Sequence, residues 1–325
     1  MDLKIGSLTL GLILGLSTTT ASASASGLQK VTSNYVSSDY AKTKYPIVFN
    51  HGMFGFTRLG ISSLGVDYFY QVLPDLARNG AHVFATQVSP LESTELRGEQ
   101  LLQQVDEVIA LTGSPKVNLI GHSHGGPTIR YIEIVAPEKV ASVTAVAGTF
   151  KGSKVADDML SNAGVKTIMT IVGQYILAPA ITLLEGNPSL PINFENSLLS
   201  LSEKGSAEFN AKYPTTAIPK DCGQGQKITS NGVYHYSWTG KAQATNILDI
   251  ADIAISQLAP LAYKNNDNDG LVNRCNTHLG QVIRDDYNQT HLDEVNQLLG
   301  LKALFGQDPV SLYRQQANRL KLEGL

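Results

Sequence analysis

The chain has 325 residues, of which 42% are hydrophobic and 16% are charged, and its formal net charge is -3. This length suits one large domain or two small ones, and the apolar fraction can supply a sizeable core. The small negative charge provides no attraction for nucleic acid or for an anionic membrane surface. Composition therefore argues against a nucleic-acid-binding role.

The first 26 residues differ in composition from the rest of the chain. Lys4 supplies a positive charge, residues 5–16 form an apolar stretch broken by glycines, and residues 18–26 are all small. Two A-x-A sequences in that last segment are typical of signal-peptidase sites. The alternative, a retained membrane anchor, would need a longer apolar stretch. We therefore expect residues 1–26 to be a cleaved signal peptide and the protein to be secreted.

Export also bears on the two cysteines, Cys222 and Cys275. An oxidising compartment favours a disulfide, and two thiols without matched histidines are too few for a structural zinc site. We expect the two to be bonded, with a pair of free buried thiols as the alternative.

After residue 44, short apolar runs alternate with longer helical patterns. Buried strands are predicted at residues 45–49, 81–88, 117–120 and 140–146. The clearest helix precedes the third strand, where Leu101, Val105 and Val108 share one face and Gly113 ends the pattern. This alternation is typical of an α/β fold, with a mostly parallel central sheet and helices on both faces.

The alternation is lost between residue 151 and about residue 219. Residues 165–184 form nearly continuous apolar sequence at helical spacing. Periodicity alone allows either a buried core helix or a mobile lid that exposes an apolar inner face on opening. We expect one domain over residues 27–325, with a helical lid insertion at about 151–219.

The sequence G-H-S-H-G at residues 121–125 matches the motif G-x-S-x-G. A buried strand runs directly into it, and a predicted helix opens after Gly126 and Pro127. Such a strand–turn–helix exposes the serine hydroxyl beside a helix N-terminus, whose dipole favours developing negative charge. The alternative is a glycine-rich loop that only turns a corner. The context favours Ser123 as a nucleophile in an α/β-hydrolase fold.

A serine hydroxyl is a weak nucleophile and needs a base that a third group holds in place. In this fold the partners follow in the order serine, acid, histidine. Of the later histidines, His235 lies in a strand-like run, which favours packing on a sheet, whereas His278 and His291 lie in loop-like surroundings. Spacing favours His291 over His278 but leaves both open.

Asp269 is the favoured acid because it precedes Gly270 at a turn that follows a polar run. The other carboxylates in range are Asp249, Asp252, Asp267, Asp285 and Asp286. Residues 265–270 also mimic the start of an EF-hand loop, but Asn276 stands where that loop requires a bidentate glutamate.

The negative charge of a tetrahedral intermediate needs two backbone N–H donors. One is expected from His124, the residue after the nucleophile, and the other from the loop after the first core strand. His51, Gly52 and Met53 occupy that loop, which makes the N–H of Met53 the expected second donor.

Several longer motifs resemble the secreted, foldase-dependent true lipases of pseudomonads and their relatives. They are K-Y-P-I-V at 44–48 with H-G-M at 51–53, R-G-E-Q-L-L at 97–102, V-N-L-I-G-H-S-H-G-G-P at 117–127 and H-L-D-E-V-N-Q at 291–297. The resemblance extends from about residue 40 to the C-terminus and is weakest between residues 155 and 206. It implies that Asp269 is the acid, that His291 is the base and that Cys222 pairs with Cys275.

The resemblance also implies one structural Ca²⁺ ion. The matching ligands are the carboxylates of Asp249 and Asp293 and the carbonyl oxygens of Gln297 and Leu301. Oxygen ligands suit this hard cation, and the ion would brace the loop that holds His291. The family further implies a periplasmic lipase-specific foldase as a partner.

Together these observations predict an extracellular triacylglycerol lipase that works at the lipid–water interface through an acyl-enzyme. A carboxylesterase or a phospholipase with the same three residues is the nearest alternative. A catalytically silent binding protein of the same fold would usually lack one of the catalytic elements.

Overall fold

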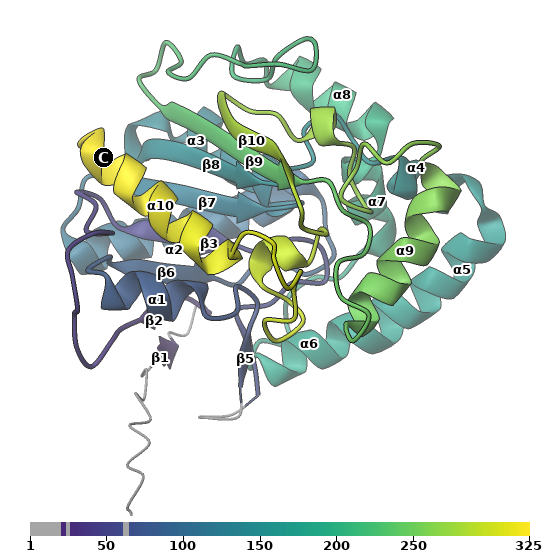
Figure 1. Ribbon diagram of the computed structural model, residues 1–325, viewed down its shortest axis with the longest axis horizontal. Helices are drawn as coiled ribbons and strands as arrows, with labels where there is room; N and C mark the ends of the chain where they lie inside the picture. The colour runs from purple at the N-terminus through teal and green to yellow at the C-terminus, as the bar shows by residue number, and fades with distance from the viewer. Residues whose placement is uncertain (1–20, 24–26, 61–64) are drawn as a thin grey trace, which may run out of the picture.

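The computed structural model describes residues 21–23, 27–60 and 65–325, and the chain is drawn in Figure 1. The predicted signal peptide at residues 1–26 lies outside the described residues, apart from Ala21–Ala23, which form strand β1.

An eight-stranded sheet, in the order β1-β2-β6-β3-β7-β8-β9-β10, forms the centre of the molecule. Strands β1 and β2 are antiparallel to their neighbours. The other six strands, β6, β3, β7, β8, β9 and β10, are parallel to one another. The remaining bounds are β2 (Gln29–Val31), β3 (Ile47–Asn50), β6 (Val83–Thr86), β7 (Val117–His122), β8 (Val140–Val146), β9 (Tyr234–Gly240) and β10 (Gln281–Tyr287). Two short strands, β4 (Arg58–Leu59) and β5 (Val66–Asp67), pair separately. The predicted mostly parallel α/β sheet is confirmed.

Two helices cover each face of this sheet. Helices α1 (Val72–Arg78) and α10 (Pro309–Leu322) pack on one face, and α2 (Thr94–Thr112) and α3 (Gly125–Val135) pack on the other. The division follows from strand geometry, because alternate residues point to opposite faces. Ile47 and Phe49 of β3 join the cluster under α1 and α10, whereas Val48 joins the cluster under α2 and α3.

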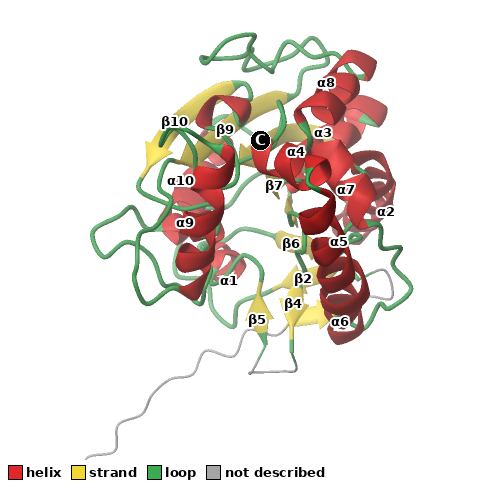
Figure 2. Cartoon of the chain, turned by 90° about the vertical axis from the view of Figure 1, so that its right-hand side faces the viewer, coloured by secondary structure: helices red, strands yellow, loops and turns green. Residues whose placement is uncertain are grey.

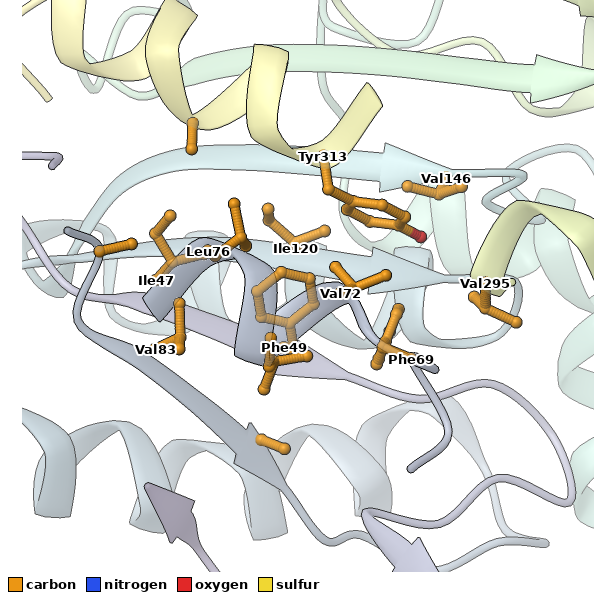
Figure 3. Packing of buried hydrophobic residues seen from close by; sticks show 14 of the residues in the cluster. Ile47, Phe49, Phe69, Val72, Leu76, Val83, Ile120, Val146, Val295 and Tyr313 are labelled. Atoms are coloured by element: carbon orange, nitrogen blue, oxygen red, sulfur yellow. The ribbon is translucent and has the colours of Figure 1, made fainter. Parts of the chain in front are cut away.

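Figure 3 shows the first of these clusters. The ring of Tyr313 from α10 lies over the sheet beside Ile120 and Val146, and Val72 and Leu76 of α1 close the cluster. Full burial of such side chains contributes about 1.5–3 kcal/mol each relative to exposure. The core thus fixes the sheet whose carboxyl ends carry the motifs.

The insertion folds as a helical layer beyond the carboxyl ends of the parallel strands (Figures 1 and 2). Its elements are α4 (Lys154–Ser161), α5 (Ala163–Val172), the π-helical turn η3 (Gly173–Leu177), α6 (Ala178–Leu184), α7 (Phe194–Leu201) and α8 (Glu203–Lys212). Helix α9 (Ile250–Ala262) lies on the same side of the molecule.

From Ala163 to Leu184 the chain forms one continuous helix of 22 residues. By length and composition it is the one helix among the described residues that could cross a membrane. Its apolar side chains are largely exposed, with 63% of Ile168, 68% of Tyr175 and 67% of Leu183 accessible. The alternative of a buried core helix is therefore wrong.

The chain directly after His291 contains little helix. Only a short 3-10 turn, η5 (Asp293–Val295), follows, and Asn296 then adopts a left-handed φ of 62° that ends it. The carboxylate of Asp293 accepts the backbone N–H of Thr290 and the hydroxyl of Thr245.

The expected disulfide between Cys222 and Cys275 is present, and it closes a loop with a sequence separation of 53 residues. Cys275 lies in the turn η4 (Arg274–Asn276), shortly after Asp269. Cross-linking a loop of this length restricts the unfolded chain.

We expect the double substitution Cys222→Ser, Cys275→Ser to lower the free energy of unfolding by about 4 kcal/mol, from the loop-closure entropy. Guanidinium unfolding of the secreted protein with and without the bridge measures this difference. An unchanged midpoint and slope would show that the bridge does not constrain the unfolded state.

Candidate active site

Ser123 lies at the sharp turn between β7 and α3. Its φ of 55° is in the left-handed region, which is strained for a serine. A Cβ on Gly121 would come within 2.3 Å of the Gly125 carbonyl oxygen, and one on Gly125 within 2.4 Å of the Asn50 carbonyl oxygen. Glycine at both positions therefore allows the turn to form, and it leaves Ser123 half-buried at the carboxyl end of the sheet.

His291 and Asp269 meet beside this turn. Nδ1 of His291 lies 2.7 Å from Oδ2 of Asp269, and both residues are buried. The second oxygen, Oδ1 of Asp269, accepts the backbone N–H groups of Leu271 and Val272 at 3.0 and 2.8 Å. The carboxylate is thus held in one orientation, and it fixes the ring of His291 with Nε2 as its remaining nitrogen.

The other candidate residues have different partners. His278 contacts the carbonyl oxygen of Gly223 and the carboxylate of Asp285. His235 lies in β9, and its Nε2 is 3.3 Å from Oε2 of Glu133 in α3. Asp267 pairs with Arg274 and Lys241, and Asp286 pairs with Arg284. Asp249 and Asp252 lie in a separate cluster with Asp293. The structure therefore brings together two of the candidate pairs, His278 with Asp285 and His291 with Asp269. The ring of His291 lies 4.6 Å from the ring of His122, the residue before Ser123.

The loop after β3 carries Met53, and His124 is the residue that precedes α3. Among the described residues, neither backbone N–H donates a hydrogen bond. Gly52, just before Met53, lies against Ser123, because a Cβ added to Gly52 would be 2.9 Å from Cβ of Ser123. Both amides are therefore available close to the serine, as an oxyanion-binding pair requires.

Arg97 of α2 hydrogen-bonds to this loop. Its guanidinium is fully buried and donates to the carbonyl oxygens of His51, at 2.6 Å, and of Ser89, and also to the hydroxyl of Thr128. Burial lowers the pKa of Arg97 to about 9. The carbonyl oxygens stabilise this buried cation. Through its several N–H donors, the guanidinium connects the loop before Met53 with α2 and α3.

Three histidines around the site are buried in neutral form. Burial, together with the positive charge of Arg97, lowers the pKa of His51 to about 3. Burial and Arg97 also hold the pKa of His124 far below its ordinary range, and burial and the nearby His291 do the same for His122. These rings serve as neutral hydrogen-bonding groups rather than as cations.

Behind His291, oxygen atoms of Asp249, Asp252 and Asp293 lie within 4.8 Å of one another, and all three residues are buried. Oδ1 of Asp293 is buried without a hydrogen-bond partner. The side-chain amide of Gln297 is engaged with the carbonyl oxygens of Asp67 and Tyr68. A buried carboxylate cluster with an unpaired oxygen fits a hard divalent cation.

The helical layer contacts the loop of Met53 directly. Met53 and Phe54 pack with Ala178 of α6 and Phe194 of α7 in one apolar cluster. The carboxylate of Glu185, just after α6, accepts the backbone N–H and the hydroxyl of Thr57. The position of α6 is therefore coupled to the loop that carries the candidate oxyanion donor.

Comparisons with known proteins agree with this architecture. Residues 45–169 match the family model for the alpha/beta hydrolase fold. The structure superposes on Staphylococcus hyicus lipase with a TM-score of 0.60 and 17% identity, covering 87% of this chain and 97% of that one. For the mature form of Bacillus licheniformis lipase BlEst2 the TM-score is 0.55, at 19% identity and with 81% and 90% coverage. The fold and the site thus define an α/β hydrolase with a serine nucleophile motif.

The sequence comparisons are more specific. The chain is 50% identical over 289 residues to a triacylglycerol lipase of Vibrio cholerae serotype O1, covering 88% of this chain and 90% of the relative. It is 37% identical over 303 residues to a triacylglycerol lipase of Pseudomonas fragi, with 88% and 99% coverage. A Burkholderia plantarii triacylglycerol lipase is 36% identical, with 88% coverage of both chains. The chain belongs to the family of bacterial triacylglycerol lipases.

Two features of the site were not predicted from the sequence. Arg97 shares the apolar face of its helix with Leu101 and Val105, and a charged residue on such a face indicates a buried ionic role. Asp252 was considered only as a catalytic acid, although its carboxylate joins Asp249 and Asp293.

The neutral histidines predict a stability that depends on pH. A histidine whose folded pKa is depressed binds fewer protons than in the unfolded chain, so its contribution is present above pH 6.5 and is lost as the pH falls toward 3. We expect His51→Gln to reduce the loss of unfolding free energy between pH 8 and pH 5 by about 2 kcal/mol. Urea unfolding at both pH values measures this.

The matched control is His82→Gln, which removes an exposed ring. We expect this variant to keep the pH-dependent loss of unfolding free energy that His51 produces, because the buried ring of His51 is still present. Equal pH dependence in all three proteins would contradict a neutral buried His51.

Proposed function

We propose that this lipase-family chain hydrolyses the ester bonds of long-chain triacylglycerols through an acyl-enzyme on Ser123. The observation that carries the proposal is the buried His291–Asp269 pair, 2.7 Å apart, beside a serine on a strained strand-to-helix turn. In α/β hydrolases this combination supplies a nucleophile, a base and an orienting acid.

In the proposed reaction, Oγ of Ser123 attacks the ester carbonyl carbon, and Nε2 of His291 takes its proton. His291 then gives the proton to the leaving alcohol, and Asp269 stabilises the imidazolium that forms in between. The backbone N–H groups of Met53 and His124 stabilise the negative oxygen. Water, activated by His291, attacks the acyl-enzyme and releases the fatty acid.

The substrate class is supported by the helical layer. We propose that residues 151–219 form the lid of a single domain spanning residues 27–325, and that its apolar face contacts the lipid–water interface. Ile168, Tyr175 and Leu183 expose apolar surface on the continuous helix, and exposed apolar patches of this kind bind lipid or protein surfaces. A carboxylesterase or a phospholipase with the same three residues is the second candidate, because the catalytic groups themselves do not select the acyl chain.

The proposal also includes secretion of the protein and binding of one calcium ion. The composition of residues 1–26 supports secretion, and the family resemblance suggests a periplasmic foldase as a folding partner. For Ca²⁺, the unpaired buried oxygen of Asp293 supports a site formed by Asp249, Asp293 and the carbonyl oxygens of Gln297 and Leu301. When bound, the ion would neutralise the carboxylates and brace the chain after His291.

The first test measures fatty-acid release from a long-chain triacylglycerol emulsion. We expect release by the wild type and a loss of at least about 10⁴-fold in Ser123→Ala, since removal of a triad member leaves only binding and oxyanion stabilisation. Both proteins are co-expressed with a cognate foldase and compared by circular dichroism.

Equal release from both proteins would overturn the assignment of Ser123. Hydrolysis of soluble short-chain esters but not of the emulsion would instead favour the carboxylesterase.

The calcium site predicts a stability change on metal removal. We expect saturating Ca²⁺ at 100 times its Kd to raise the free energy of unfolding of the wild type by about 2.7 kcal/mol over the chelated protein. In Asp293→Asn this difference should disappear, and in Asp286→Asn, which changes an exposed carboxylate paired with Arg284, it should remain. Denaturant unfolding with calcium and with EGTA measures it. A full calcium response in Asp293→Asn would place the ion elsewhere.

A further inference from the structure

Tyr68 lies buried beneath the loop of Met53 and has no part in the proposed reaction. It precedes α1, its side chain belongs to the core cluster of α1 and α10, and its ring contacts His51, Phe56 and Phe69. Its hydroxyl, however, contacts Gly52 and His122 of the candidate site, and His122 in turn contacts the His291 segment.

Three hydrogen bonds connect these segments through Tyr68 and His122. The backbone N–H of Gly52 donates to Oη of Tyr68 at 3.2 Å, and Oη lies 2.8 Å from Nδ1 of His122. On the other side of the ring, Nε2 of His122 lies 2.9 Å from the carbonyl oxygen of His291. Gly52, Tyr68, His122 and His291 are all buried, so water does not compete for these bonds.

The chemistry of the end groups fixes the direction of every bond. A backbone N–H only donates, so Oη of Tyr68 accepts from Gly52 and directs its own proton to Nδ1 of His122. A carbonyl oxygen only accepts, so Nε2 of His122 carries the ring proton and donates it to His291. The ring is thus required as a neutral imidazole with one defined tautomer, in agreement with the lowered pKa of His122.

Each end of this chain adjoins a reacting group. Gly52 precedes Met53, and a Cβ on Gly52 would lie 2.9 Å from both Oη of Tyr68 and Cβ of Ser123. His122 precedes Ser123 in the motif, and its ring lies 4.6 Å from the ring of His291. The hydrogen bonds therefore set the spacing of oxyanion loop, nucleophile and base independently of the His291–Asp269 bond.

We propose that Tyr68 and His122 are positioning residues, which hold the oxyanion loop, Ser123 and His291 in the geometry that binds the transition state. This inference rests on the proposed serine hydrolase function and extends it to two residues that do not touch the reacting atoms. Small displacements of such groups reduce the rate more than they reduce substrate binding.

The test compares Tyr68→Phe with Tyr313→Phe. Both variants remove one buried hydroxyl from the same aromatic cluster, but Oη of Tyr313 has no hydrogen-bond partner among the described residues. On a soluble p-nitrophenyl ester we expect Tyr68→Phe to lower kcat on the order of 10-fold with KM nearly unchanged. Tyr313→Phe should stay within about 2-fold of the wild type, because it breaks no bond.

A boronic acid that forms a tetrahedral adduct with the serine provides a second measurement. Its affinity should fall in Tyr68→Phe by about the same factor as kcat/KM, since both depend on the oxyanion loop. A loss of thermal stability with unchanged kcat and unchanged boronate affinity would overturn the proposal and leave Tyr68 a structural residue.

A double-mutant cycle tests whether the two residues act through one chain. His122→Gln retains an acceptor and a donor and should keep more activity than His122→Phe, which removes both. In the His122→Phe background, Tyr68→Phe should lower the activity little further, because the chain of hydrogen bonds is already broken. Fully additive losses would contradict a connected chain.

Nitrogen-15 NMR of histidine-labelled enzyme reports the tautomer directly. We expect the proton of His122 on Nε2 in the wild type and a shift of the Nδ1 resonance in Tyr68→Phe. A proton on Nδ1 would reverse the assigned direction and overturn the proposal. If the wild-type protein neither hydrolyses the ester nor binds the boronic acid, the proposed function itself fails. If the wild type is active but Tyr68→Phe and Tyr313→Phe have equal kcat, the positioning role alone is refuted.

Discussion

The turn at Ser123 brings three backbone segments together without side chains between them. Gly121 and Gly125 lie so close to neighbouring carbonyl groups that any Cβ would overlap with them, and a Cβ on Gly52 would lie 2.9 Å from Cβ of Ser123. This contact forces β3, β7 and the start of α3 into one arrangement, and it holds Ser123 at a positive φ that isolated serine disfavours. In the proposed mechanism, the amides of Met53 and His124 and the ring of His291 must all be placed relative to this fixed turn.

Buried polar groups then provide the placement. Arg97 binds the carbonyl oxygens on one side of the loop, and the Tyr68–His122 chain binds its N–H on the other. In a desolvated site such bonds are strong, and an unmatched group would be costly. Neutral histidines fit this role because an imidazole both accepts and donates without carrying a buried charge.

The proposed base, His291, and the proposed acid, Asp269, come from two loops of the C-terminal half, and each loop is restrained by contacts other than the His291–Asp269 bond. The loop of Asp269 is tied by the Cys222–Cys275 bridge, and the loop of His291 adjoins the buried cluster of Asp249, Asp252 and Asp293. The apolar helix from Ala163 to Leu184 reaches the opposite loop through Phe54 and Glu185. This helix and the loop that carries Met53 are therefore in direct contact.

Local sequence determined those features that depend on short-range pattern. The buried strands, the helix that ends at Gly113 and the strand–turn–helix around Ser123 were all predicted, because hydrophobic period and glycine placement act over a few residues. Longer motifs, through family resemblance, also indicated Asp269, His291 and the disulfide. Only the tertiary structure decided that His278 pairs with Asp285, that Asp252 joins the acidic cluster, and that Tyr68 and His122 connect three distant segments. Those contacts join residues far apart in the chain, and their partners are set by how the loops meet at the carboxyl end of the sheet, which local periodicity does not encode.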